Sequence, residues 1–182
     1  MVTSLRFSVK YLILLVVLPG VLVGSSGCDG SPSATPTLQD SQSLLATSVP
    51  GAYEEVLVVR VIDGDTVELE NGERVRYLGI DTPETVHPSK PVECYGPEAS
   101  ERNKELVEGK TVRLLQDGPD RDGYDRLLRY VFVDGTFVNG DLVWGGYAYA
   151  RSYGGSYLLY QTLIQLEKSA NDSKRGLWAE CY

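Results

Sequence analysis

The sequence predicts an α+β fold: a small closed five-stranded β-barrel of the OB type with three packed helices. Three observations predict it: β-branched segments with period-two alternation, an Asn-Gly hairpin signal, and one helical segment inserted after the third strand. The chain has 182 residues, 42% hydrophobic and 23% charged, which is an ordinary globular balance. Its length favours one folded domain with flanking tails.

The first three strands are predicted as a meander. Residues 53–61 are rich in β-branched side chains, and Asp63-Gly64 forms a turn. Residues 66–70 alternate apolar and polar side chains. Asn71-Gly72 then favours a tight hairpin because both residues tolerate positive φ, so residues 74–80 return as the third strand.

The remaining elements follow a proline-rich stretch. Residues 81–96 are predicted as a loop, and a helix runs from Pro97, which suits a first helical turn, to Gly109. Two further strands and two further helices are expected at residues 111–116, 127–133, 138–145 and 156–175.

Residues 1–28 have the features of an export signal. Arg6 and Lys10 precede an apolar run over residues 11–23 that ends in small residues and Cys28, and this run is shorter than the roughly 20 residues of a membrane span. The end of the segment resembles a lipobox, which predicts lipidation of Cys28 and a membrane anchor, although Ser25 stands where Leu is usual. A signal cleaved without lipidation and a retained anchor are the alternatives. We expect an exported protein, extracellular and tethered to the membrane or secreted.

Residues 29–51 are rich in Ser, Thr and Pro and too poor in apolar residues to form a core, so we expect a flexible tether before a domain at residues 52–182. The formal net charge of −8 counts against a protein that coats nucleic acid with a basic surface, and it leaves room for a local cationic pocket. His87 is the only histidine, which disfavours a zinc site, and no nucleophile-elbow motif accompanies it.

Three segments carry chemistry-bearing residues. They are the Asp-Gly-Asp-Thr turn at residues 63–66, the RYLGIDTPE segment at residues 76–84 and the DGYDR segment at residues 122–126. Taken singly, each has an ordinary structural interpretation, as a hairpin turn, a capped turn and a solvated loop. Their functional interpretation depends on their occurrence together.

In this order and spacing the three segments resemble the staphylococcal-nuclease (thermonuclease) family. The match continues through T-x-H-P at residues 85–88, VECYGPEAS at residues 92–100 and GLW at residues 176–178, and covers about residues 56–178. The resemblance implies a calcium-dependent nuclease that hydrolyses DNA and RNA, single- or double-stranded, and leaves 3′-phosphates. We expect a monomer, and the sequence itself leaves the oligomeric state open.

The resemblance assigns the metal ligands to Asp65, Asp81 and the backbone carbonyl of Thr82. Two neighbouring carboxylates suit a hard divalent cation such as Ca²⁺, which neutralises their repulsion and polarises a phosphate. The same resemblance makes Arg76, Glu84 and Arg126 catalytic.

The roles of these three residues follow from the chemistry. A guanidinium fork fits paired phosphate oxygens, which is the role expected for both arginines; a surface salt bridge is the alternative. Glu84 is expected to orient or deprotonate the attacking water.

Substrate contacts are expected from Tyr124, which matches a family position at a second phosphate, and from Tyr153 as the residue that stacks on a base. Gly123 replaces the lysine that is usual before this tyrosine, and of the family's lysine-rich loop only Lys90 is present. The first replacement weakens the contact with the second phosphate. The second, together with the negative net charge, predicts slower electrostatic capture of nucleic acid and a stronger dependence on the cation.

The three cysteines suggest two fates. In an exported protein Cys94 and Cys181 can form a disulfide, which explains the odd count if Cys28 carries lipid.

Two rival functions remain at this level. One is a binding module on the same barrel, for which the catalytic set would be unnecessary. The other is a surface lipoprotein whose acidic loop binds calcium without cleavage.

Overall fold

The computed structural model describes residues 53–182 except residues 87, 88, 90, 153 and 156. The predictions for the export signal, Cys28 and the tether therefore lie outside the described residues, as do those for Tyr153 and His87. Within the described part of the chain, no helix has both the length and the hydrophobicity that crossing a bilayer requires.

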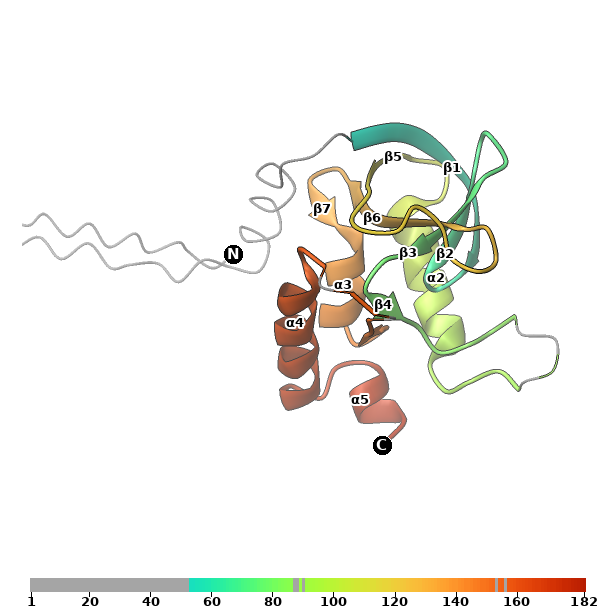
Figure 1. The fold of residues 1–182 in the computed structure, drawn as a ribbon. Coiled ribbons are helices and arrows are strands. Elements are labelled where there is room, and N and C mark those ends of the chain that lie inside the picture. Colours follow the sequence, from blue (N-terminus) through green and yellow to red (C-terminus); the bar gives the residue numbers. More distant parts are fainter. Residues whose placement is uncertain (1–52, 87–88, 90, 153, 156) are drawn as a thin grey trace, which may run out of the picture. The chain divides into compact units, whose positions relative to one another are not determined.

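A closed five-stranded barrel forms the centre of the domain (Figure 1). Its strands neighbour one another in the order β3-β2-β1-β5-β6, and a parallel pairing of β3 with β6 closes the circle. This confirms the predicted OB-type fold. The barrel strands are β1 (Tyr53–Asp63), β2 (Thr66–Leu69), β3 (Arg74–Tyr77), β5 (Thr111–Leu115) and β6 (Leu127–Val133), and the short β7 (Thr136–Phe137) extends the sheet beside β6.

The apolar side chains that alternate along the strands fill the interior of the barrel. Successive side chains of a strand point to opposite faces, so every second apolar residue reaches the interior. The Asn71-Gly72 turn forms as predicted, with Gly72 at φ 83°. Five valines from five different strands are fully buried there: Val58, Val67, Val75, Val112 and Val131.

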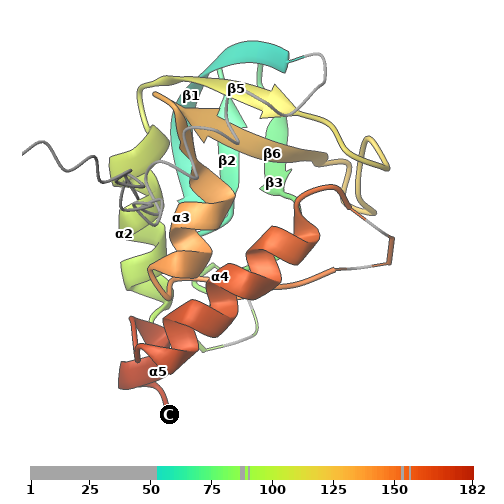
Figure 2. The ribbon, with the colours of Figure 1, turned by 90° about the vertical axis from the view of Figure 1, so that its left-hand side faces the viewer.

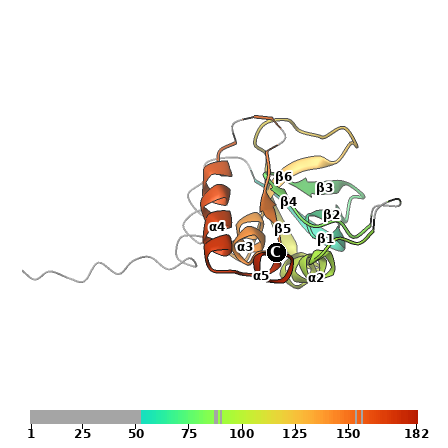
Figure 3. The ribbon, with the colours of Figure 1, turned by 90° about the horizontal axis from the view of Figure 1, so that it is seen from below.

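The described residues form four helices, of which α2 and α3 contact the barrel while α4 packs on α3 and the short strand β8 (Tyr149–Ala150). Figure 3 shows α3 between α2 and α4, and Figure 2 shows α4 crossing in front of α3. Pro97 lies in the first turn of α2, where the missing amide hydrogen costs nothing. The helices are α2 (Gly96–Val107), α3 (Val138–Trp144), α4 (Tyr160–Asp172) and the one-turn α5 (Leu177–Glu180), which adds to the three predicted.

The predicted third strand is too long. It ends at Tyr77, and Gly79 with φ 78° turns the chain so that β4 (Ile80–Asp81) pairs with β8 (Tyr149–Ala150) instead. This second sheet sets the position of Asp81, and the partner strand lies too far along the sequence for local alternation to indicate it.

Helix α4 begins four residues later and ends three residues earlier than the helix predicted at residues 156–175. Tyr157 and Leu159 insert into the core before α4 starts, and the Asp117 carboxylate accepts a hydrogen bond from the Leu158 amide at 2.6 Å. These tertiary contacts hold residues 157–159 out of the helix.

Two contacts hold the C-terminal segment against the rest of the domain. A Cβ on Gly146 would lie 2.2 Å from the Arg175 carbonyl oxygen, and one on Gly176 would lie 2.4 Å from the Gly146 carbonyl oxygen. Only glycines permit this approach, which lets the Leu177 amide donate to Gly146 at 2.9 Å. The second contact is a disulfide between Cys94 and Cys181, the pairing expected from the sequence.

Candidate active site

Two buried asparagines hold the strands that carry the site. Asn103 of α2 donates to the Asp63 carbonyl at 3.1 Å and accepts from the Tyr77 hydroxyl at 2.9 Å. Asn139 of α3 donates to the Leu78 carbonyl at 2.9 Å and accepts from the Val131 amide. Sequence reasoning missed both residues, because a single polar residue in an amphipathic helix gives no sign of its partner.

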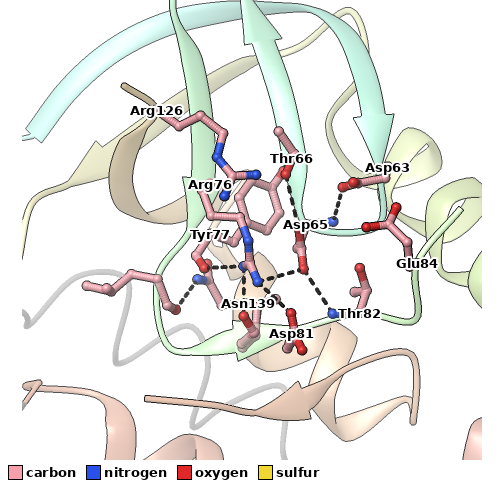
Figure 4. A network of polar contacts seen from close by, with 12 residues as sticks. Asp63, Asp65, Thr66, Arg76, Tyr77, Asp81, Thr82, Glu84, Arg126 and Asn139 are labelled. Atoms are coloured by element: carbon pink, nitrogen blue, oxygen red, sulfur yellow. Dashed lines mark hydrogen bonds and ion pairs between the residues drawn. The ribbon is translucent and has the colours of Figure 1, made fainter. Parts of the chain in front are cut away.

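Arg76 lies at the centre of the site with a buried side chain (Figure 4). Its Nη1 donates to the carbonyl oxygens of Tyr77 and Ile80 at 2.9 and 2.7 Å. Its Nη2 lies 3.1 Å from Asp65 Oδ2 and 2.7 Å from Asp81 Oδ1. The backbone thus fixes the orientation of the guanidinium, and one nitrogen atom faces both carboxylates.

Asp65 is held from several sides. Its Oδ1 accepts from the Thr66 hydroxyl at 3.0 Å, and its Oδ2 accepts from the Thr82 amide at 2.9 Å. Gly64 permits this arrangement, since a Cβ there would lie 2.7 Å from the Thr82 hydroxyl oxygen. The glycine of the Asp-Gly-Asp-Thr turn is therefore needed for the contact between this turn and Thr82.

Asp63, at the end of β1, adds a third carboxyl group beside this cluster. Burial, and then the neighbouring Asp65 charge, raise the pKa of Asp63 to about 7. The region thus resists further negative charge, which favours a cationic ligand.

Glu84 lies in the loop that follows β4. Its carboxylate accepts from the amides of Thr85 and Val86 at 2.9 and 2.8 Å. Its backbone is held by Glu93, whose side chain accepts from the Glu84 amide at 3.0 Å and whose amide donates to the Glu84 carbonyl at 2.9 Å. Glu93 directly precedes the disulfide-bonded Cys94. The hydrogen bonds between Glu84 and Glu93 therefore join the two ends of the loop next to the disulfide.

Arg126 comes from the loop before β6 and pairs with Asp122. The carboxylate Oδ2 accepts from Nε at 2.7 Å and lies 2.6 Å from Nη2, while Oδ1 accepts from the Tyr124 and Arg126 amides. Burial alone would raise the pKa of Asp122, but the hydrogen bonds from Arg126 and Tyr124 outweigh it and lower that pKa below its ordinary value. The Asp122–Arg126 pair was not predicted.

One cavity of about 360 Å³ joins these groups, which is within the range of small-ligand sites. Figure 4 shows Arg126 and Glu84 on either side of the Arg76 cluster. Two further cavity residues, Arg151 and Tyr157, were not predicted. Of the residues predicted from the resemblance, the cavity brings together Asp65, Arg76, Asp81, Thr82, Glu84, Tyr124 and Arg126.

The residues fit a divalent cation shared with substrate. Asp65 and Asp81 offer hard oxygen donors beside Arg76 Nη2. The hydrogen bond from the Thr82 amide to Asp65 brings the Thr82 backbone close to these carboxylates. Among the described residues, no group of three or more His, Cys, Asp or Glu side chains is arranged as a metal cage. The protein would supply few ligands, and water and phosphate oxygens would complete the coordination.

A closed barrel whose cavity combines paired carboxylates, a glutamate and two arginines defines a class of protein that acts on phosphate esters. Comparison with known proteins narrows this class. The family described as "Staphylococcal nuclease homologue" matches residues 74–180. The chain belongs to the staphylococcal nuclease family.

Individual relatives agree with this assignment. The chain is 38% identical over 125 residues to a protein named "Thermonuclease" from Staphylococcus hyicus, covering 67% of this chain and 74% of that protein. A second "Thermonuclease", from Staphylococcus intermedius, is 38% identical over 136 residues, covering 73% and 80%. The "Endonuclease YncB" of Bacillus subtilis is 42% identical over 130 residues, covering 69% and 62%. The protein is a nuclease, a hydrolase of phosphodiester bonds in nucleic acids.

Proposed function

We propose that this nuclease uses Ca²⁺, acts outside the cell on both DNA and RNA, single- or double-stranded, and leaves 3′-phosphates. One observation carries the proposal: Asp65 and Asp81 converge on one nitrogen of the buried Arg76, within a cavity that Glu84 and Arg126 also line. A pure binding module would not need this combination of groups.

The two arginines bind the phosphate whose ester is cleaved. Arg76 is oriented in advance by two backbone carbonyls, so little reorganisation accompanies binding. Arg126 is held by Asp122 through Nε and Nη2, which leaves its Nη1 for a phosphate oxygen. Both guanidinium groups stabilise the negative charge that develops on the equatorial oxygens.

Glu84 orients the attacking water and accepts its proton. The water oxygen bonds to phosphorus, the bond from phosphorus to the 5′-oxygen breaks, and that oxygen takes a proton from solvent, so a 3′-phosphate and a 5′-hydroxyl result. Ca²⁺ bound by Asp65, Asp81 and the Thr82 carbonyl would supply charge neutralisation at the phosphate.

Two features support export. The basic, apolar and small-residue pattern of residues 1–28 is typical of a signal segment, and Cys28 would carry a lipid that tethers the domain through residues 29–51. The Cys94–Cys181 disulfide is of the kind that persists in oxidising compartments. We propose a monomer at the cell surface, with a secreted form as the alternative.

The decisive experiment compares cleavage of single-stranded DNA by the purified protein in Ca²⁺, in Mg²⁺ and in chelator. Glu84→Gln should lower kcat by roughly 10²–10⁴-fold, the range of general base catalysis. Glu98→Gln is the matched control, because Glu98 is exposed in the first turn of α2. Full activity in chelator, or equal losses in the two variants, would reject the mechanism.

A further inference from the structure

Arg151 lies in the cavity wall formed by the small second sheet. Its amide donates to the Gly79 carbonyl at 2.9 Å, which continues the β4–β8 pairing by one residue. Asp81 pairs with Tyr149 in that ladder. Because side chains alternate along a strand, Arg151 lies on the same face as Tyr149 and Asp81.

Arg151 differs from the other two cavity arginines in its ionic partners. Arg76 is neutralised by Asp65 and Asp81, and Arg126 by Asp122. The Arg151 guanidinium has no carboxylate partner among the described residues, and its side-chain contact is with the Tyr149 ring, 5.6 Å from the ring centroid. Arg151 is an exposed residue that lines the cavity.

A guanidinium without a carboxylate partner in the cavity wall can attract an anionic ligand. The chain carries a formal charge of −8, so a cavity-lining cation with no acidic partner is a local attraction for anions. Gly123 stands before Tyr124 on the wall formed by the loop before β6, and it offers no cationic side chain there. Arg151 supplies a positive charge from a different wall.

We infer that Arg151 forms a second phosphate subsite, which binds the phosphate adjoining the one that is cleaved. This inference rests on the proposed action on nucleic acid, in which each nucleotide brings one phosphate. The planar guanidinium can grip that phosphate with two parallel hydrogen bonds. Arg76 and Arg126 hold the scissile group, and Arg151 fixes the direction in which the strand leaves it.

The test uses substrates that differ by one phosphate. A dinucleoside monophosphate is compared with the same compound bearing a terminal phosphate at its 5′ or its 3′ end, so that each has one cleavable ester. In the wild type one of the terminal phosphates should lower KM by roughly tenfold, which corresponds to one charge-assisted contact. Arg151→Ala should abolish this gain, and the KM of the unphosphorylated substrate should rise by much less than that of the phosphorylated one.

Two further variants separate a specific contact from general charge. Arg151→Lys should keep part of the gain, because it retains the charge but not the paired hydrogen bonds. Lys168→Ala removes one positive charge from the exposed face of α4, where Lys168 pairs with Asp172, and should change nothing. Persistence of the gain in Arg151→Ala, an equal loss in Lys168→Ala, or no gain in the wild type would overturn the inference.

A binding measurement keeps the test independent of catalysis. In chelator, the affinity for a single-stranded oligonucleotide is measured as a function of salt. Loss of one phosphate contact in Arg151→Ala should reduce the slope of log K against log salt by about 0.7. Absence of cleavage by the wild type would reject the proposed function, whereas an unchanged slope would reject the subsite alone.

Discussion

The centre and the rim of the cavity are built in different ways. The centre consists of Asp65, Arg76 and Asp81, which come from strands or their ends and are joined by ion pairs around a buried guanidinium. The rim consists of Glu84 and Arg126, which come from loops and are held by hydrogen bonds within those loops. The difference indicates that the centre couples function to stability, while the rim can change in function without changing the fold.

The largest expected effect is a difference in stability between two equivalent substitutions, Arg76→Met at the centre and Arg126→Met at the rim. Arg76→Met leaves Asp65 and Asp81 without their cation, and removing one partner of a buried ion pair typically costs about 3–5 kcal/mol. Arg126→Met removes a pair at the cavity rim whose side chains are 24% and 18% exposed, so a smaller loss of stability than for Arg76→Met is expected. Urea unfolding should therefore separate the variants, although both should lose roughly 10²–10³-fold in kcat or more.

The matched control is the double variant Arg76→Met, Asp65→Asn. It should recover part of the lost stability by removing one unpaired carboxylate, and it should recover no activity. Equal destabilisation by the two single methionine variants would show that the centre and the rim do not differ as described.

A smaller effect is expected from Asp122→Asn at the rim. The asparagine can still accept the backbone hydrogen bonds, but it loses the charge that orients Arg126, so kcat should fall roughly tenfold with little change in stability. Steady-state kinetics and thermal unfolding measure the two quantities. Faster cleavage by the variant would mean instead that Asp122 competes with phosphate for Arg126.

A pH dependence of stability is also expected at the centre. The pKa of Asp63 is raised to about 7, so between about pH 4 and pH 7 the folded protein holds a proton that the unfolded chain has lost. Without added cation, the free energy of unfolding should therefore fall as the pH rises through this window. Asp63→Asn should flatten the profile in urea titrations, and an unchanged slope would exclude Asp63 as its source.

The sequence predicted the barrel well because alternation and turn residues are local signals. The strand at Leu127–Val133 has the predicted bounds, and the Asn71-Gly72 turn forms as expected. The break after Tyr77 was missed because it depends on pairing between Asp81 and Tyr149, which are far apart in the sequence.

The candidate site likewise contains residues that sequence motifs predict and residues whose roles depend on tertiary contacts. Its seven described members were assigned by resemblance and motif spacing, and the structure places them around one cavity. Asn103, Asn139 and Arg151 were missed, since their roles come from tertiary contacts of single polar residues. The Asp122–Arg126 pair is local, but nothing in the motif distinguishes it from a solvated loop.

The disulfide between Cys94 and Cys181 has a consequence for how the molecule withstands proteases. The bond closes a covalent ring that contains β5, β6, every helix from α2 to α5 and the loop carrying Arg126. A single cut in that loop opens the ring but leaves both fragments joined as one molecule. If the enzyme works outside the cell as proposed above, a peptidase would nick it without separating its two fragments, which would stay joined instead of diffusing apart.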